Sequence, residues 1–307
     1  MTRLAFLLFG VVLLLGGLLT APGCGREGSN DVADSTEPAA GKTGDGEDVA
    51  KYGGTEADGQ PAKPPAKKYL LRYDLTPGER STLVMKMESL GGTAAVPPMT
   101  MKMDVTVDSA SAEGFSFSFE YTDMTINGEP LPSTMKGVLG MKGDARCTSR
   151  GETLSAEFRL PDDAPELLKT MLKGMEKQIR EMSCPLPEHA VGVGDTWTLS
   201  QKVSAGMFSI DQTATYTLKE CDGKHCVLDV KIHQLAERQE LNLPGLPEGM
   251  EATLNHLTGE GAGTMEIELS SALPKRSSVE ISSKFSMTIG GSAQDQSSRV
   301  RVTFSTE

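Results

Sequence analysis

The sequence predicts a mainly β fold, built as a curved antiparallel sheet that forms a half-barrel or an open barrel, with one amphipathic helix. Three observations predict it. Apolar and polar residues alternate along most of the chain after residue 68, no repeated helical crossover joins the alternating runs, and only the segment 162–183 has apolar residues at helical spacing. Each strand is therefore expected to bury one face.

The chain begins with the features of an exported precursor. Arg3 precedes an apolar run from Leu4 to Thr20, and small residues then lead to Cys24. The stretch APGCG around Cys24 resembles the bacterial lipobox, in which a cysteine is acylated and becomes the new N-terminus. We therefore expect residues 1–23 to be a lipoprotein signal peptide and Cys24 to be the lipidation site. A retained transmembrane helix is the alternative, because such a helix needs only about 17–25 apolar residues.

A polar tether is expected to follow the anchor over residues 24–68. From residue 25 onward it contains no Leu, Ile, Phe, Met or Trp, so it cannot build a core. As a flexible coil it would span roughly 35–40 Å. The predicted location is thus the bacterial envelope, with the membrane as a partner through the lipid anchor. Gly25 stands where an aspartate would favour inner-membrane retention, and resemblance to known sorting favours the outer membrane.

The charge of the chain excludes nucleic acid as an expected partner. The net charge is −12, of which Arg3 contributes +1 and residues 25–68 contribute −3, leaving −10 on the β-rich domain 69–307. A field of that sign repels phosphate backbones, and no basic stripe interrupts it.

The clearest strand patterns lie early in the β-rich domain. The runs STLVMKMES, MTMKMDVTVD and GFSFSFEYTD each place apolar residues on one face and polar residues on the other. Similar runs recur to the C-terminus, including ATYTLKE, VLDVKIH, TMEIELS and RVRVTFS. These strands are expected to be half-buried.

One helix is predicted over residues 162–183. The Asp163 side chain can cap the N-terminus of this helix, and the Glu166 side chain can hydrogen-bond back to the backbone amide of Asp163. The helix is expected to end at Cys184 and Pro185. Its apolar stripe should lie against the sheet or over the mouth of whatever the sheet encloses. That stripe comprises Leu168, Met171, Leu172, Met175, Ile179 and Met182.

The strands also suggest an internal duplication, with halves at 69–160 and 185–307 on either side of the helix. The segment 103–124 parallels 214–235, and 137–155 parallels 261–282. The alternative is that similar strands and turns produce these parallels by chance.

Taken together, these features resemble a bacterial family of uncharacterised envelope lipoproteins defined by a domain of unknown function. The resemblance rests on the lipobox, the tether, the methionine-alternating strands and the stretch CPLPEHAVGVGDTWTL, with Gly192, Gly194, Asp195 and Trp197. It implies a β-rich envelope lipoprotein and supplies no catalytic residue or substrate. More loosely, a curved sheet covered by a helix is similar to lipoprotein-carrier and lipoprotein-receptor folds, which hold acyl chains.

Catalysis, cofactors and metal binding are not expected. The chain lacks the nucleophile elbow GxSxG, the zinc motif HExxH, a phosphate loop and a Rossmann glycine motif. Its four histidines are scattered and lack cysteine or carboxylate neighbours at ligand spacing: His189, His225, His233 and His256.

Four cysteines beyond the anchor predict two disulfides in an exported protein. Nearest neighbours would pair Cys221 with Cys226 and Cys147 with Cys184. Matching the apolar faces of the flanking strands instead sets Leu218 opposite Cys226 and puts Cys221 in the turn of the hairpin. A Cys221–Cys226 disulfide therefore needs a β-bulge or a less tight turn.

The high methionine content, sixteen residues, is the basis for the functional prediction. Met is a flexible apolar side chain that adapts to variable hydrocarbon, so we expect a non-catalytic protein that binds an apolar ligand or acyl chain in a concave cavity. One alternative is a structural lipoprotein with a packed interior and an acidic surface that meets another envelope protein. The other is copper handling through thioethers. The predicted ligand-binding residues are Met85, Met87, Met101, Met103, Phe117, Phe119, Met171 and Met175.

Overall fold

The computed structural model describes residues 67–94, 96–131, 137–159, 186–204, 208–241 and 250–307. The predicted signal peptide, the lipidation site Cys24, nearly all of the tether and the predicted helix 162–183 lie outside the described residues. What is described is mainly β, as the alternating sequence predicts.

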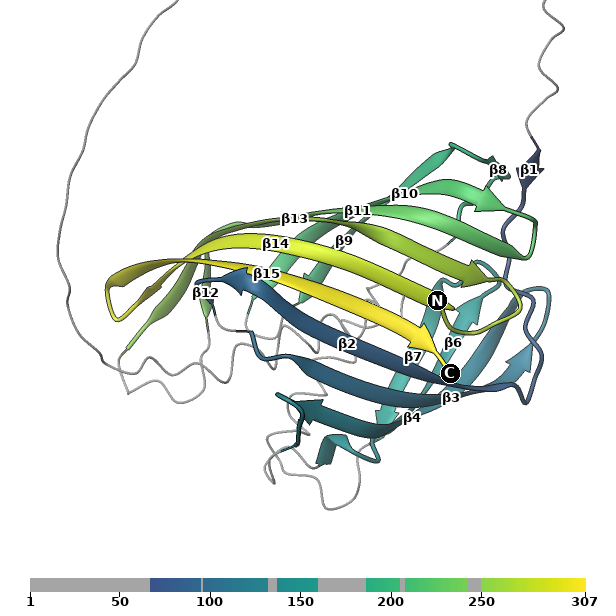
Figure 1. The fold of residues 1–307 in the computed structure, drawn as a ribbon, viewed down its shortest axis with the longest axis horizontal. Helices are drawn as coiled ribbons and strands as arrows, with labels where there is room; N and C mark the ends of the chain where they lie inside the picture. The colour runs from purple at the N-terminus through teal and green to yellow at the C-terminus, as the bar shows by residue number, and fades with distance from the viewer. Residues whose placement is uncertain (1–66, 95, 132–136, 160–185, 205–207, 242–249) are drawn as a thin grey trace, which may run out of the picture. The chain divides into compact units, whose positions relative to one another are not determined.

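The strands form a long antiparallel meander, drawn in Figure 1. Most belong to one large sheet, and a few are only two or three residues long. Their bounds are β1 (Lys68–Tyr69), β2 (Arg80–Gly92), β3 (Met99–Ala110), β4 (Gly114–Ile126), β5 (Glu129–Pro130), β6 (Lys142–Thr148), β7 (Thr153–Arg159), β8 (Val191–Gly192), β9 (Thr196–Ser204), β10 (Ser209–Cys221), β11 (His225–Ala236), β12 (Gln239–Leu241), β13 (Ala252–Glu268), β14 (Arg276–Ile289) and β15 (Ser292–Thr306).

The main sheet has the strand order β7-β6-β4-β3-β2-β15-β14-β13-β11-β10-β9. Every pairing in it is antiparallel, and the last strand, β15, joins the first long strand, β2. Within the described residues the sheet ends at β7 and β9 and does not close on itself. This confirms the predicted open antiparallel sheet.

The topology contains two consecutive meanders that follow the proposed halves. The hairpin β3–β4 occupies the place in the first meander that β10–β11 occupies in the second, and β6–β7 corresponds in the same way to β13–β14. These are the segments whose sequences run parallel. The duplication itself stays a prediction.

Two neighbouring residues show how strongly the sheet curves. The amide of Tyr73 donates to the carbonyl of Ser149, just after β6, while the amide of Asp74 donates to the carbonyl of Leu269, just after β13, both at 2.8 Å. β6 and β13 are six strand positions apart, which would be about 29 Å in a flat sheet. The sheet therefore curves back on itself, and β6 and β7 pass behind β2 and β15 in Figure 1.

Residues 70–75, here called the entry segment, cover one end of the curved sheet. Leu71, Tyr73 and Leu75 alternate along it and are buried. The guanidinium of Arg72 points the other way and donates to the carbonyls of Pro187 and Glu188, each at 2.9 Å. The segment thus joins the core to the chain that leads into the second meander.

Glycines on β13 allow a close approach to the neighbouring strands. A Cβ on Gly263 would overlap the carbonyl oxygen of Ser278 and the Cα of Val279 on the neighbouring strand β14. A Cβ on Gly261 would likewise overlap the side chain of Ile281. Glycine inside a strand commonly marks a close backbone approach, and here it lets the backbone of β14 lie close against β13.

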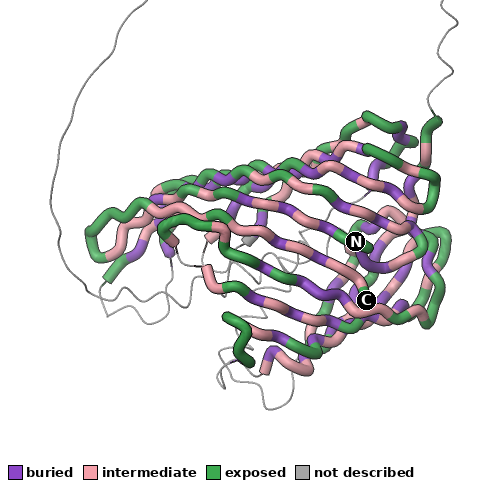
Figure 2. The backbone as a smooth tube through the Cα atoms, viewed as in Figure 1, coloured by how far each residue is buried: buried purple, intermediate pink, exposed green. Residues whose placement is uncertain are grey.

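The inner face of the sheet carries the core, and buried residues alternate with more exposed ones along the strands in Figure 2. A large cluster fills the end nearest the entry segment and draws residues from both meanders. A smaller cluster lies towards the other end and comprises Ile210, Ala236, Leu241, Ala252, Leu254 and Leu257.

The hairpin β10–β11 corrects one sequence-based register. Leu218 lies opposite Leu228, and not opposite Cys226 as apolar matching predicts. A bulge between Leu218 and Glu220 shifts the register and brings Cys221 opposite Cys226, where the two form a disulfide. The nearest-neighbour pairing is therefore confirmed for this bridge, through the bulge that it requires.

The second predicted disulfide is half outside the described residues. Cys147 is buried on β6, with its sulfur 4.0 Å from the hydroxyl oxygen of Thr153. Cys184 lies outside the described residues. The pairing of these two cysteines stays a prediction.

Candidate functional site

The six predicted ligand-binding residues on described strands all face the inside of the sheet. Each is at most 8% exposed, and all belong to the large core cluster. They come from three adjacent strands, Met85 and Met87 from β2, Met101 and Met103 from β3, and Phe117 and Phe119 from β4. The other two predicted residues, Met171 and Met175, lie outside the described residues.

Strand register brings three thioethers into one line. Met85 of β2 lies opposite Met101 of β3, which lies opposite Met124 of β4. Directly opposite residues in an antiparallel pair have Cβ atoms about 4.5–5.5 Å apart. We call the buried inner-facing methionines of this region the methionine layer: Met85, Met87, Met99, Met101, Met103 and Met124.

Sequence reasoning missed Met124. Strict alternation from Phe119 and Tyr121 would turn Asp123 inward, but a bulge between Lys102 and Met103 changes the pairing of β3 with β4. Met124 is consequently only 2% exposed, while Asp123 is exposed. The two successive polar residues before Met124 were the available signal, since they break the alternation.

Aromatic rings line the inner face beside the methionine layer. The Phe119 ring packs edge-on against Phe158 of β7 at 5.3 Å between centroids and against Tyr121 at 5.9 Å. Tyr73 of the entry segment packs edge-on against Phe115 at 5.7 Å. Burial raises the pKa of the Tyr121 hydroxyl well above its usual range, so Tyr121 stays neutral in this apolar surrounding.

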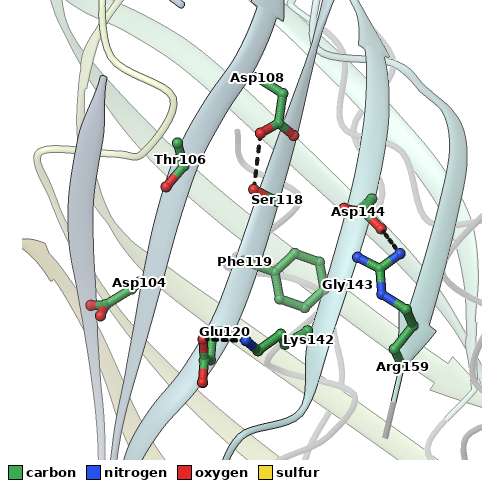
Figure 3. Close-up of a pocket in the computed structure, with 10 residues that line it drawn as sticks. All are labelled: Asp104, Thr106, Asp108, Ser118, Phe119, Glu120, Lys142, Gly143, Asp144 and Arg159. Atoms are coloured by element: carbon green, nitrogen blue, oxygen red, sulfur yellow. Dashed lines mark hydrogen bonds and ion pairs between the residues drawn. The ribbon is translucent and has the colours of Figure 1, made fainter. Parts of the chain in front are cut away.

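A pocket of about 450 Å³ lies over the outer side of the same strands, β3, β4, β6 and β7, and is shown in Figure 3. Four of its six charged lining residues form two ion pairs. Lys142 lies 3.2 Å from Glu120, and Arg159 lies 2.5 Å from Asp144. The pocket is polar and open, so it suits a hydrated ligand better than a hydrocarbon chain.

Gly143 and Phe119 both line this pocket. Gly143 of β6 lies opposite Phe119 of β4, and a Cβ on Gly143 would overlap the Phe119 ring. Figure 3 shows the Phe119 ring lying between the two strands, with Glu120 and Lys142 below it in this view. The pocket therefore adjoins the aromatic inner layer, and Phe119 is the only apolar side chain among the described residues that line it.

Among the described residues no group of three or more His, Cys, Asp or Glu side chains could hold a metal ion. In the same part of the chain, no helix has the length and apolar character needed to cross a membrane.

The glycine-rich stretch before β9 forms a turn. Asp195 accepts a hydrogen bond at its carboxylate from the amide of Gly192 at 2.9 Å, and Gly194 has φ +93°, which favours glycine. Trp197 then begins the inner face of β9 and stacks on Tyr216 at 5.6 Å between centroids. These residues have structural roles in the described fold.

This stretch lies inside a match to a known family model. Residues 170–274 match DUF6263, a family of unknown function. The match covers about a third of the chain and includes strands β8 to β13. It agrees with the expected resemblance to an uncharacterised family with a β-rich domain. No curated protein matches the chain.

Proposed function

We propose that this chain is a non-catalytic envelope lipoprotein that binds an apolar ligand or acyl chain against the inner face of its sheet. The observation that carries the proposal is the methionine layer, which lies with the Phe117 and Phe119 rings on the concave side of a sheet that stays open between β7 and β9. Unbranched thioether side chains repack at low cost around hydrocarbon of variable shape. A rigid core would favour branched aliphatic residues.

The energetics favour long chains over short ones. Burying one methylene contributes about 0.8 kcal/mol, so fourteen methylenes contribute about 11 kcal/mol, against a cost of association of about 4–15 kcal/mol. Each added methylene should therefore tighten binding about fourfold. This dependence on length distinguishes hydrocarbon binding from nonspecific adhesion of a charged head group.

The first experiment is native mass spectrometry of the full-length chain bearing Cys24→Ser, followed by displacement of a fluorescent fatty acid with acids of increasing length. We expect co-purifying lipid and the fourfold increment per methylene. Absence of co-purifying lipid together with absence of probe binding would refute the proposal. The packed structural lipoprotein would then be the better description.

Substitutions on β3 test whether the methionine layer is the site. Met103 is 1% exposed on the inner face, so Met103→Asp should abolish probe binding in protein that remains folded. Thr100→Asp is the matched control, because Thr100 lies on the outer side of the same strand and should leave binding unchanged. If Met103→Asp does not fold, Met103→Trp is the second variant, because its larger apolar side chain should occupy the space of the ligand without burying a charge. Unchanged binding by a folded inner-face variant would refute this site.

A second candidate function is Cu(I) binding. The line Met85, Met101 and Met124 places three thioethers on adjacent strands, and soft thioether ligands suit Cu(I). Competition with a chromophoric Cu(I) chelator tests it, with Met101→Leu as the variant that removes the central sulfur at nearly constant volume. Equal metal retention by wild type and variant would reject this candidate.

The membrane attachment is proposed through Cys24. Its position after an apolar run and within APGC supports acylation, and stable anchoring requires about two acyl chains. Cys24→Ser should move the protein from the membrane fraction to the soluble envelope fraction. Retention of the variant in the membrane at the wild-type level would refute the anchor.

A further inference from the structure

A row of polar and small residues crosses the inner face beyond the methionine layer. Gln201 of β9 lies opposite Gln212 of β10, and Gln212 lies opposite Gln234 of β11. The register continues this level across β13, β14 and β15, where Gly259, Ser283 and Ser298 lie opposite one another in turn. We call this set the polar row: Gln201, Gln212, Gln234, Gly259, Ser283 and Ser298.

The polar row lies between the two apolar clusters. On β10, Ala214 on one side of Gln212 belongs to the large cluster, and Ile210 on the other side belongs to the small one. On β11, Ile232 and Ala236 flank Gln234 in the same way. A ligand lying along the inner face would thus meet hydrocarbon, then amides and hydroxyls, then hydrocarbon again.

Two glutamines of the row are almost completely buried. Gln212 is 1% exposed and Gln234 is 2% exposed, and the Nε2 of Gln234 donates to the Oε1 of Gln212 at 2.8 Å. Gly259 makes this arrangement possible, because a Cβ there would come within 2.7 Å of the Gln234 Oε1. This part of the row therefore depends on three residues on neighbouring strands, the hydrogen-bonded pair Gln212 and Gln234 and the glycine that leaves room for them.

Hydrogen-bonding capacity remains unused in this row. Within the described part of the chain, the Nε2 of Gln212 and both polar atoms of the Gln201 amide are enclosed without a hydrogen-bond partner. Buried polar side-chain atoms in folded proteins nearly always have a partner. Two donor groups and one acceptor therefore face the interior at one level of the sheet.

We propose that the polar row binds an uncharged carbonyl group, an ester or amide, carried by the acyl ligand, an inference that rests on the proposed function. The Gln212 Nε2 donates to the carbonyl oxygen, and the Gln201 amide donates to the same group or accepts from an amide N–H. The hydrocarbon on either side lies against the apolar clusters. Within the row itself a carboxylate or phosphate is disfavoured, because the row offers neutral groups only and a buried anion needs a cationic partner, so a fatty-acid probe binds with its carboxylate outside the row.

The test compares two ligands of equal chain length, methyl hexadecanoate and octadecane, each delivered from cyclodextrin to the full-length Cys24→Ser chain. Displacement of the fluorescent fatty acid reports their affinities. Wild type should bind the ester about tenfold more tightly than the alkane, as expected for one hydrogen bond to a buried donor. Equal affinities would overturn the role of the row while leaving the proposed function intact. Failure of both ligands to bind would overturn the proposed function and this inference with it.

The variant Gln212→Met should lose the preference for the ester and keep its affinity for the alkane within about twofold. Gln294→Met is the matched control, because Gln294 is exposed on β15, outside the row, and the control should keep the full preference. Thermal unfolding verifies the fold, and Gln201→Met is the second variant if Gln212→Met is unstable. A folded row variant that keeps the tenfold preference would overturn the inference.

Discussion

The amide of Asp74 donates a 2.8 Å hydrogen bond to the carbonyl of Leu269, joining the start of the first meander to the end of β13 in the second. The adjacent amide of Tyr73 binds Ser149 after β6. One short segment therefore connects points that are distant in the sheet order. The curvature that brings the inner faces together is thus tied to residues before the first long strand.

Loss of the Arg72 side chain should loosen this connection. Arg72→Ala removes the hydrogen bonds to Pro187 and Glu188 and should lower the free energy of unfolding by about 1 kcal/mol, because the guanidinium is only partly buried. Urea denaturation measures the change. Arg276→Ala, at an exposed position on β14, is the control and should have little effect; equal losses in the two variants would contradict the role of Arg72.

Adding one methyl group to β13 should distort the sheet. In Gly263→Ala the new Cβ would overlap backbone atoms of Ser278 and Val279, which cannot turn away as a flexible side chain can. We expect the free energy of unfolding to fall by about 1–3 kcal/mol. Gly192→Ala is the matched control, since the nearest atom to its Cβ lies at 3.4 Å. A Gly263→Ala protein as stable as the control would show that the sheet relaxes freely here.

Removal of the disulfide between Cys221 and Cys226 should have a moderate effect. The bridge closes a short loop, with a sequence separation of 5, for which chain entropy predicts a loss of about 2 kcal/mol in Cys221→Ser/Cys226→Ser. Denaturation of wild type with and without reductant should reproduce that loss. Peptide mapping without reduction should recover both cysteines in one closed ring, and a link from Cys221 to Cys147 would contradict it.

An outer-face cluster should make stability depend on pH. The carboxylate of Glu280 accepts hydrogen bonds from Arg301 at 2.5 Å and Arg299 at 2.8 Å, and these contacts lower the pKa of Glu280. A carboxyl with a lowered folded-state pKa stabilises the fold above its unfolded pKa, and this stabilisation disappears as pH falls through the folded pKa.

Glu280→Gln should consequently lower Tm at neutral pH and have no effect at a pH below the folded pKa of Glu280. Thermal unfolding across an acidic pH series measures this convergence. Glu260→Gln, at an exposed position on the outer side of β13, is the control. A Tm difference for Glu280→Gln that stays constant down to strongly acidic pH would contradict the assignment to ionisation.

Local alternation was sufficient to predict which residues face inward on most strands. Met85, Met101 and Phe117 are buried as expected, because side chains on successive strand residues point to opposite faces whatever the partner strand is. The same argument failed at Met124, which is buried although strict alternation would turn it outward. Register matching failed at Leu218, which is buried as expected but lies opposite Leu228 instead of Cys226. A bulge is the reason in both places, and a bulge depends on how two strands pair.

The sequence by itself therefore determined the fold class, including a curved antiparallel sheet, and the inward position of Met85, Met87, Met101 and Met103, since side-chain alternation depends on residues that are close along the chain. Only the tertiary structure decided between the two registers proposed for Cys221, the extent of the curvature and the polar row. Gln212 and Gln234 meet within one hairpin, but the Gly259 that leaves room for the Gln234 amide lies on the next long strand. Such a row is set by the register of several strands at once, and no local periodicity records that register.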